Sequence, residues 1–235
     1  MTRGRQTPPK AAKVSLGLGL SDVFPAFGGG AFSARAGGGC LQGDEPGNAH
    51  ESARQRQNGR MSDGELWDLT DAQGNLHGAT HQRGAPGWPA GAFHIVAGVC
   101  VVRDDGLVLL TLRSAIKDYP LMWEFPAGSA LAGETSIQAA ERELREETGL
   151  VALPESMRLV GRFTEATALF DFYVTRARDA AELDVDNDEV DDAEWVTLDE
   201  VARRWDAGLM AGPWAPRLVE FWPRLVELVA QVGRI

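Results

Sequence analysis

The segment with the clearest chemical content is residues 128–150, where acidic residues recur at helical spacing. If this segment is helical, Glu143, Glu146 and Glu147 fall within an arc of about 100°, because a helix has 3.6 residues per turn. Carboxylates gathered on one edge repel each other and raise each other's pKa unless a cation offsets their charge. Oxygen ligands alone suit Mg²⁺ or Mn²⁺, and no His or Cys lies nearby to favour zinc. Glu134, just ahead of the helix, can add a fourth carboxylate.

A simpler interpretation of the same acids is a solvated helix face. Glu is a common residue on helix surfaces, and Arg142 and Arg145 could form weak surface pairs with Glu146 or Glu141. Glu134 could merely complement the positive end of the helix dipole. Considered without its neighbours, the helix leaves both interpretations open.

The helix that would position these carboxylates has recognisable ends. Thr135 or Ser136 can cap its first turn, and Gly149 suits the left-handed residue that follows a helix. The apolar residues between them recur at spacings of three and four and predict an inward-facing side: Ile137, Ala140 and Leu144.

Apolar and β-branched runs on both sides of this helix predict strands. The expected strands are residues 65–70, a strand from 76 onward, 93–102, 107–113, 159–164, 168–175 and 194–196. Residues 218–232 carry apolar side chains at helical spacing and predict a C-terminal helix. Strands interspersed with helices indicate an α/β (α+β) domain in which helices cover a sheet.

The segment GSALAGETSIQAAERELREETGL, residues 128–150, resembles the Nudix box, Gx5Ex7REUxEExGU, where U is a bulky aliphatic residue. Every defining position is occupied: Gly128, Glu134, Arg142, Glu143, Leu144, Glu146, Glu147, Gly149 and Leu150. By this resemblance the chain is identified as a Nudix hydrolase, with the domain at residues 61–235. The resemblance implies the Nudix fold, a mixed β-sheet sandwiched between helices.

The same resemblance implies a Mg²⁺-dependent hydrolase that cleaves a diphosphate bond in a nucleoside diphosphate derivative or nucleotide, with Mn²⁺ as the alternative cation. Arg142 would orient the carboxylates. Bound metal would offset the charge of the diphosphate and lower the pKa of a water molecule. The residues that the resemblance assigns to the metal site are Gly128, Glu134, Glu143, Glu146 and Glu147.

The residue that accepts the proton from the attacking water varies among Nudix proteins. Glu146 is one candidate, and Glu189, outside the box, is another. Glu189 precedes the strand that contains Trp195, within an acidic run from Asp184 to Asp192. A solvated loop explains that run more simply than catalysis does. The expected catalytic set is therefore Arg142, Glu143, Glu146 and Glu189.

Three residues near the expected site are candidates for substrate contact. Arg113 and Lys117 could bind phosphate oxygens, and Trp123 could stack on a base. The alternative is that the two cations are ordinary surface charges and that the tryptophan is core.

Two other functions remain open at this stage. The stretch from Tyr119 to Gly128 resembles both sugar-nucleotide pyrophosphatases and isopentenyl-diphosphate-isomerase-like Nudix proteins, and Glu65 to Asp68 points to the isomerase-like branch. The catalytic cysteine of true isomerases is not found upstream of the box, and Cys100 lies on an expected core strand. The second of these functions is that of a non-catalytic module that binds nucleotides or a protein.

Charge is unevenly distributed along the 235 residues, whose formal net charge is −11. Residues 61–235 carry 15 basic and 30 acidic residues, which argues against a general nucleic-acid binder. No apolar run approaches the roughly 18 residues of a membrane-spanning helix. Two distant cysteines indicate a reducing cytoplasm. The expected partner is a small nucleotide or diphosphate substrate, and because many Nudix proteins dimerise, a homodimer is a further expectation.

Residues 1–60 differ from the rest, with 8 basic and 4 acidic residues and 12 of the 27 glycines. This composition predicts a disordered or weakly ordered Gly-rich extension. A targeting peptide is one alternative, and translated sequence upstream of a native start at Met61 is another.

Overall fold

The computed structural model describes residues 64–177, 183–185 and 187–233. The chain divides into two units, Met1–Ala49 and His50–Ile235, and all the described residues belong to the second. The predicted extension at residues 1–60 lies outside the described residues, so its interpretations remain predictions. Among the helices that are described, none is both long and apolar enough to cross a membrane.

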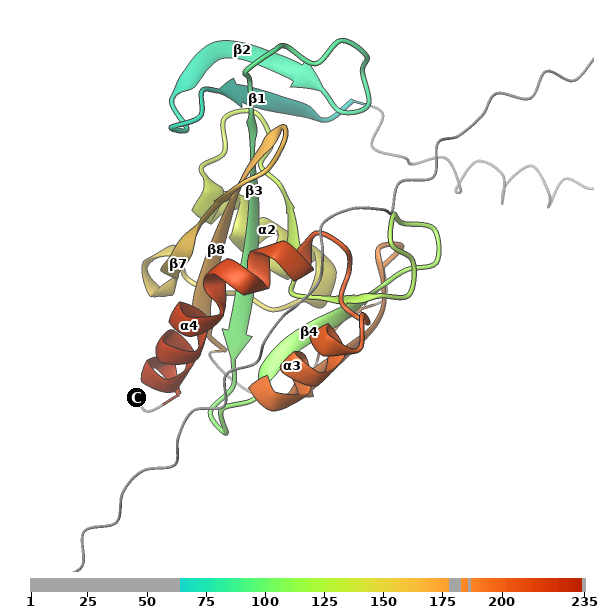
Figure 1. Ribbon diagram of the computed structural model, residues 1–235, viewed down its shortest axis with the longest axis vertical. Coiled ribbons are helices and arrows are strands. Elements are labelled where there is room, and N and C mark those ends of the chain that lie inside the picture. The colour runs from blue at the N-terminus through green and yellow to red at the C-terminus, as the bar shows by residue number, and fades with distance from the viewer. Residues whose placement is uncertain (1–63, 178–182, 186, 234–235) are drawn as a thin grey trace, which may run out of the picture. The chain divides into compact units, whose positions relative to one another are not determined.

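The described chain forms a small two-stranded sheet, a larger mixed sheet and the helices that cover it (Figure 1). The strands are β1 Leu66–Thr70, β2 Leu76–Gln82, β3 His94–Val102, β4 Val108–Arg113, β5 Trp123–Glu124, β6 Ala127–Ser129, β7 Arg158–Thr164, β8 Ala168–Arg176 and β9 Val190–Val196. The helices are α2 Ser136–Thr148, a 3-10 turn Pro154–Ser156, α3 Leu198–Asp206 and α4 Trp214–Val232.

The larger sheet is built around two parallel strands, β3 and β8, in register from His94 opposite Ala168 to Val102 opposite Arg176. The order across it is β5-β4-β3-β8-β7, with β6 antiparallel to β3 and β9 antiparallel to β4. Because β6 runs beside β3, the start of the Nudix box is anchored to the centre of the sheet.

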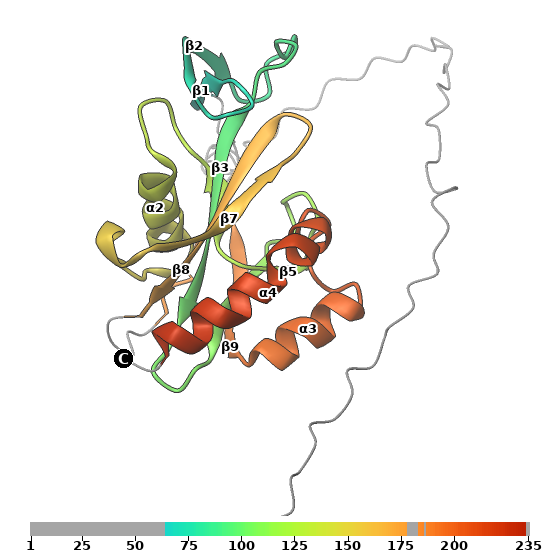
Figure 2. The same ribbon diagram turned by 60° about the vertical axis from the view of Figure 1, so that its left-hand side comes forward.

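Helices lie on both faces of this sheet, and Figure 2 shows α2 on one side and α3 and α4 on the other. Successive side chains of β3 alternate between the two faces, as a pleated strand requires. Val99 and Val101 pack in the cluster beneath α2, whereas Cys100 and Val102 pack in the cluster beneath α4. The predicted mixed sheet between helices is therefore confirmed.

Helix α2 begins and ends where the sequence predicts. Thr135 is its cap: the Thr135 hydroxyl accepts a bond from the Gln138 amide, and the Gln138 side chain accepts one from the Thr135 amide. Gly149 follows the last turn with φ of 72°, which suits glycine. The sequence did not predict β5, β6, the 3-10 turn or α3. It also placed the starts of β9 and α4 at residues 194 and 218, whereas they lie at Val190 and Trp214.

Candidate active site

Arg142 lies at the centre of the acidic edge of α2 and uses every part of its guanidinium group. Nε and Nη2 donate to the two carboxylate oxygens of Glu134, at 2.9 and 3.0 Å. Nη1 donates to Glu143 at 2.8 Å and to Glu146 at 3.0 Å. Nη2 also donates to the carbonyl of Ser129 at 2.8 Å, which ties the helix to β6. One arginine therefore holds three acids of the box in a fixed arrangement.

Glu143 occupies a space that exists because residue 128 is glycine. A Cβ added to Gly128 would lie 2.5 Å from Oε2 of Glu143 and closer still to its Cδ and Oε1. Burial raises the pKa of Glu143 to about 7, although the nearby Arg142 partly offsets that effect. The carboxylate is thus confined between β6 and α2 with its charge only partly compensated.

Glu147 is the most buried acid of the box, with 2% of the residue exposed. Both of its carboxylate oxygens are buried and neither has a hydrogen-bond partner. Lys117 is the nearest cation, with Nζ 3.9 Å from Oε1. Burial and the charge of Glu124 hold the pKa of Glu147 well above its usual range. An unpartnered carboxylate of this kind is costly unless something positive completes it.

Glu124 is a further acid of this region that the sequence reasoning missed. It lies on β5, is 6% exposed, and accepts a 2.6 Å bond from Nη1 of Arg113. Burial raises its pKa despite that pairing. The sequence did contain a signal, because Glu124 interrupts an apolar run between Trp123 and Phe125. Acidic side chains are rarely buried unless they are paired, so an acid inside such a run is a candidate for a specific role.

Lys117 and Glu189 come together from segments far apart in the chain, at 2.6 Å between Nζ and Oε2. Ser114 holds the two segments together, because its amide donates to the Glu189 carbonyl and its hydroxyl donates to the Asp188 carbonyl. Burial tends to raise the pKa of Glu189, but the Lys117 pair outweighs that effect and holds the pKa below its usual value. The acidic loop ahead of β9 is therefore joined to the site.

The remaining predicted site residues occupy different positions around this cluster. Glu146 is at its solvent side, with 56% of its side chain exposed. Arg113 is engaged by Glu124 and by the Asp118 carbonyl at 2.6 Å. Trp123 alternates with Glu124 along β5 and packs against the core below α4, with the Arg204 guanidinium 4.1 Å from its ring centroid. Substrate contact by Trp123 stays a prediction, as do the substrate roles of Arg113 and Lys117.

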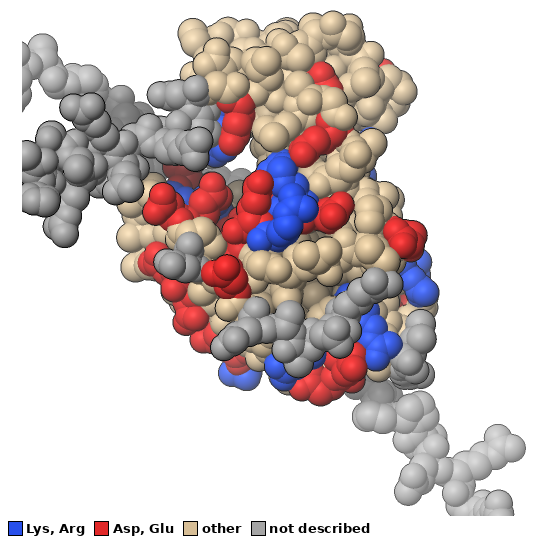
Figure 3. All heavy atoms as spheres, turned by 180° about the vertical axis from the view of Figure 1, so that it is seen from behind, with Lys and Arg blue, Asp and Glu red and all other residues tan. Residues whose placement is uncertain are grey.

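Charged side chains of both signs alternate across the middle of one face of the molecule (Figure 3). Among the described residues, no group of three or more His, Cys, Asp or Glu side chains is arranged so that it could hold a metal ion as it stands. The donor set nevertheless fits a hard divalent cation, because Glu147 has two unpartnered oxygens and Glu143 fills the space beside Gly128. The side-chain ligands available here are all carboxylate oxygens, which suit Mg²⁺ or Mn²⁺.

Comparisons with known proteins agree with this geometry. The family model for the NUDIX domain matches residues 92–218. An uncharacterised Nudix hydrolase of Listeria monocytogenes is 36% identical over 140 residues, which cover 58% of this chain and 82% of that protein. An 8-oxo-dGTP diphosphatase of Haemophilus influenzae is 37% identical over 81 residues, 34% of this chain and 59% of that protein.

The fold has a counterpart among solved structures. The crystal structure of a Deinococcus radiodurans protein superposes with a TM-score of 0.56 at 21% identity and covers 67% of this chain and 99% of that one. The family-model match and the Listeria relative show that this chain belongs to the Nudix family and is a hydrolase. Nothing in the comparisons favours an isomerase, and Cys100 is wholly buried in the core beneath α4.

Proposed function

We propose that the protein is a Mg²⁺-dependent Nudix hydrolase that cleaves the diphosphate bond of a nucleoside diphosphate derivative. The single observation that carries this proposal is the buried carboxylate of Glu147, whose two oxygens have no hydrogen-bond partner and whose nearest cation, Lys117, is 3.9 Å away. It lies in the same electrostatic group as Glu143, Glu124 and Glu189. Several buried or half-buried acids repel each other, and a bound divalent cation would offset that repulsion.

In this proposal Glu147 and Glu143 are the main ligands of the cation, and Glu146 and Glu134 complete the acidic edge. Arg142 keeps Glu134, Glu143 and Glu146 in position through four hydrogen bonds, and a fifth holds it to the Ser129 carbonyl. When bound, Mg²⁺ would offset the charge of the diphosphate and lower the pKa of a water molecule. Gly128 leaves room for the carboxylate of Glu143, since any side chain there would displace it, and its assignment to the metal site stays a prediction.

The proton acceptor in this proposal is Glu146 or Glu189. Glu146 is half exposed, and it must break only one hydrogen bond, the 3.0 Å bond from Arg142, to reach a substrate. Glu189 has its pKa lowered by Lys117, which makes it a weaker base until that lysine turns away. A lysine that leaves an acid for a phosphate oxygen would both bind the substrate and free the base.

A substrate screen with matched variants tests the proposal. Purified protein is incubated with nucleoside di- and triphosphates, ADP-ribose, sugar nucleotides, dinucleotide polyphosphates and coenzyme A, with Mg²⁺ or Mn²⁺, and the products are identified by mass spectrometry. We expect hydrolysis at a diphosphate bond and a loss of more than about 100-fold in Glu147→Gln. Glu141→Gln, on the same helix but outside the cluster, is the control. Wild-type turnover in both Glu146→Gln and Glu147→Gln would contradict the mechanism.

Two features of the proposal concern the setting of the enzyme. Cys100 is free and buried, consistent with a reducing cytoplasm, and fractionation of the natural host would test that location. Homodimerisation remains a prediction, and light scattering on the purified protein measures it directly.

A further inference from the structure

We propose that the β1–β2 hairpin is part of the catalytic apparatus and that Asp68 is a positioning residue for the carboxylate of Glu134. The hairpin precedes residue 92, where the match to the family model begins. This inference rests on the proposed function, because the group that Asp68 positions is one of the acids assigned to the cation site.

The hairpin contacts the Nudix box through two short hydrogen bonds. The carboxylate oxygen Oδ2 of Asp68 accepts from the backbone amide of Gly133 at 2.7 Å. The carbonyl of Leu66 accepts from the backbone amide of Ala132 at 2.7 Å. Both donors lie immediately before Glu134. The loop that precedes α2 is therefore bonded to the hairpin at the two residues ahead of its functional acid.

Within the same loop, Leu131 also forms hydrogen bonds with Glu134. The amide of Leu131 donates to the Glu134 side chain at 2.9 Å, and the amide of Glu134 donates to the Leu131 carbonyl at 2.9 Å. Glu134 then presents both oxygens to Arg142. A displacement at Gly133 would thus pass through one residue to Glu134 and through Arg142 to Glu143.

Gly133 makes the loop dependent on an outside anchor. It has φ of +88°, and nothing lies within 4 Å of the position that a Cβ would occupy. Glycine has the widest choice of backbone conformations, so local sterics do not hold it in place. The acceptor oxygen of Asp68 supplies that anchor, because its 2.7 Å hydrogen bond holds the Gly133 amide in one orientation.

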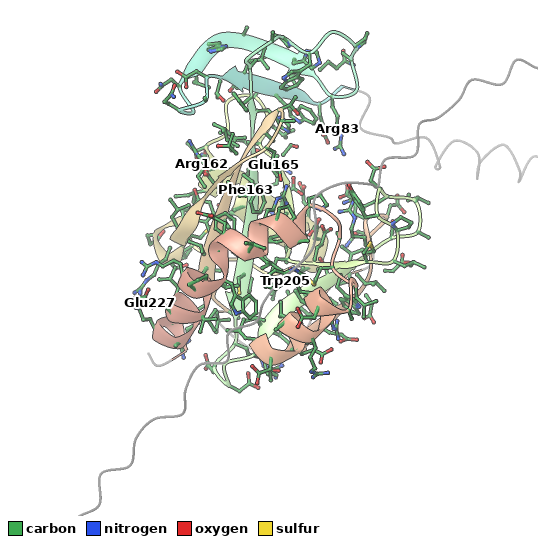
Figure 4. All side chains as sticks on the ribbon, in the orientation of Figure 1. Arg83, Arg162, Phe163, Glu165, Trp205 and Glu227 are labelled. Carbon is green, nitrogen blue, oxygen red and sulfur yellow. The ribbon has the colours of Figure 1, made fainter. Side chains whose placement is uncertain are left out.

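The hairpin itself is held firmly enough to serve as that anchor. The Trp67 ring stacks on His94 of β3 with centroids 4.2 Å apart, and Trp88 packs edge-on against both rings. At the turn, Nη1 of Arg162 donates to the Gln73 carbonyl at 3.2 Å. Figure 4 shows Arg162 and Arg83 at opposite ends of the hairpin.

The test compares Asp68→Ala, Asp68→Asn and the control Asp71→Ala in the full chain. Asp71 lies in the same hairpin but bonds only within its turn, to Gln73 and Asn75. Three quantities are measured: kcat and KM for the best diphosphate substrate, the dissociation constant of Mn²⁺ by electron paramagnetic resonance, and hydrogen exchange of the Gly133 amide.

We expect Asp68→Ala to lower kcat and weaken Mn²⁺ binding by about tenfold each, the lower end of effects seen for residues behind metal ligands. KM should change little, and the Gly133 amide should exchange faster. Asp68→Asn keeps an acceptor oxygen and should recover most of both losses. Asp71→Ala should match the wild type in kcat and Mn²⁺ affinity.

Several results would overturn the inference. Wild-type Mn²⁺ affinity in Asp68→Ala would refute it, even if no substrate had been found. An equal loss in Asp71→Ala would show that hairpin stability alone matters, and an equal loss in Asp68→Asn would exclude positioning by the hydrogen bond. Failure of the proposed function is distinct, because the wild type itself would then bind no Mn²⁺ and hydrolyse no diphosphate.

Discussion

Substituting Gly128 with alanine should remove activity while leaving the fold almost intact. Residue 128 lies on β6, beside β3, and does not have the positive φ that would penalise alanine. The added Cβ would lie 2.5 Å from Oε2 of Glu143, whereas ordinary contact begins at 3.4 Å. Cδ and Oε1 of Glu143 would lie closer still, so the carboxylate must move by at least about 1 Å, which would weaken its bond to Arg142.

A misplacement of about 1 Å in a catalytic group commonly costs on the order of 100-fold in rate, or about 2.7 kcal/mol of transition-state stabilisation. We expect that loss in kcat/KM for Gly128→Ala, with a melting temperature close to that of the wild type. Steady-state kinetics and thermal unfolding measure the two quantities on the same preparation.

Gly98→Ala is the matched control, because Gly98 lies on β3 opposite Ala127, one residue along from Gly128. Its added Cβ would lie 2.7 Å from Cζ of Phe170 in the core. Overpacking of this kind costs about 1–3 kcal/mol of stability, so Gly98→Ala should lose stability and keep its kcat. Full activity in Gly128→Ala would refute the reasoning that glycine there makes room for the carboxylate.

Three further outcomes follow from the same structure. Arg113→Ala should lower the free energy of unfolding in urea by about 3–5 kcal/mol, because it leaves Glu124 buried without its ion-pair partner. The double variant Arg113→Ala/Glu124→Gln should recover most of that loss. A loss below about 1 kcal/mol in the single variant would be inconsistent with a buried pair. Burial raises the pKa of the Cys100 thiol, so in a Cys40→Ser background a thiol reagent should label Cys100 only after unfolding, and labelling of the native protein would contradict its burial. Gly149→Ala should lower the free energy of unfolding by about 2 kcal/mol, because φ is +72° and the new Cβ would lie 2.8 Å from Cβ of Asp184. An unchanged unfolding midpoint would contradict the left-handed conformation of residue 149 at the end of α2.

Local spacing was sufficient to predict the part of the site that lies on one helix. Arg142 and Glu143 are neighbours along the chain, and the box places Glu146 one turn beyond Arg142, so their contacts follow from helical geometry once the helix is known. Thr135 and Gly149 define the ends of that helix for equally local reasons. The β-branched and apolar runs predicted the longer strands because burial on both faces of a central sheet demands them.

Contacts between distant segments could not be predicted in the same way. The pairing of Lys117 with Glu189 joins residues 72 positions apart, and the bond from Gly133 to Asp68 spans 65. Neither leaves a periodic signal, because each depends on how separate elements pack. Helix α3 was missed since five of its nine residues are charged and Val201 is its one fully buried residue, with Leu198 and Trp205 only partly buried.

Thermal unfolding of the wild type and Glu147→Gln, each in EDTA and in saturating Mg²⁺, tests the central claim most directly. Binding at 100 times the dissociation constant contributes about 2.7 kcal/mol, which for a domain of this size raises the melting temperature by about 5–10 °C. We predict that rise in the wild type and little or none in Glu147→Gln. In EDTA the variant should be at least as stable as the wild type, because a neutral amide replaces a buried acid that has no hydrogen-bond partner. An equal Mg²⁺ response in the two proteins would contradict the assignment of Glu147 to the cation site.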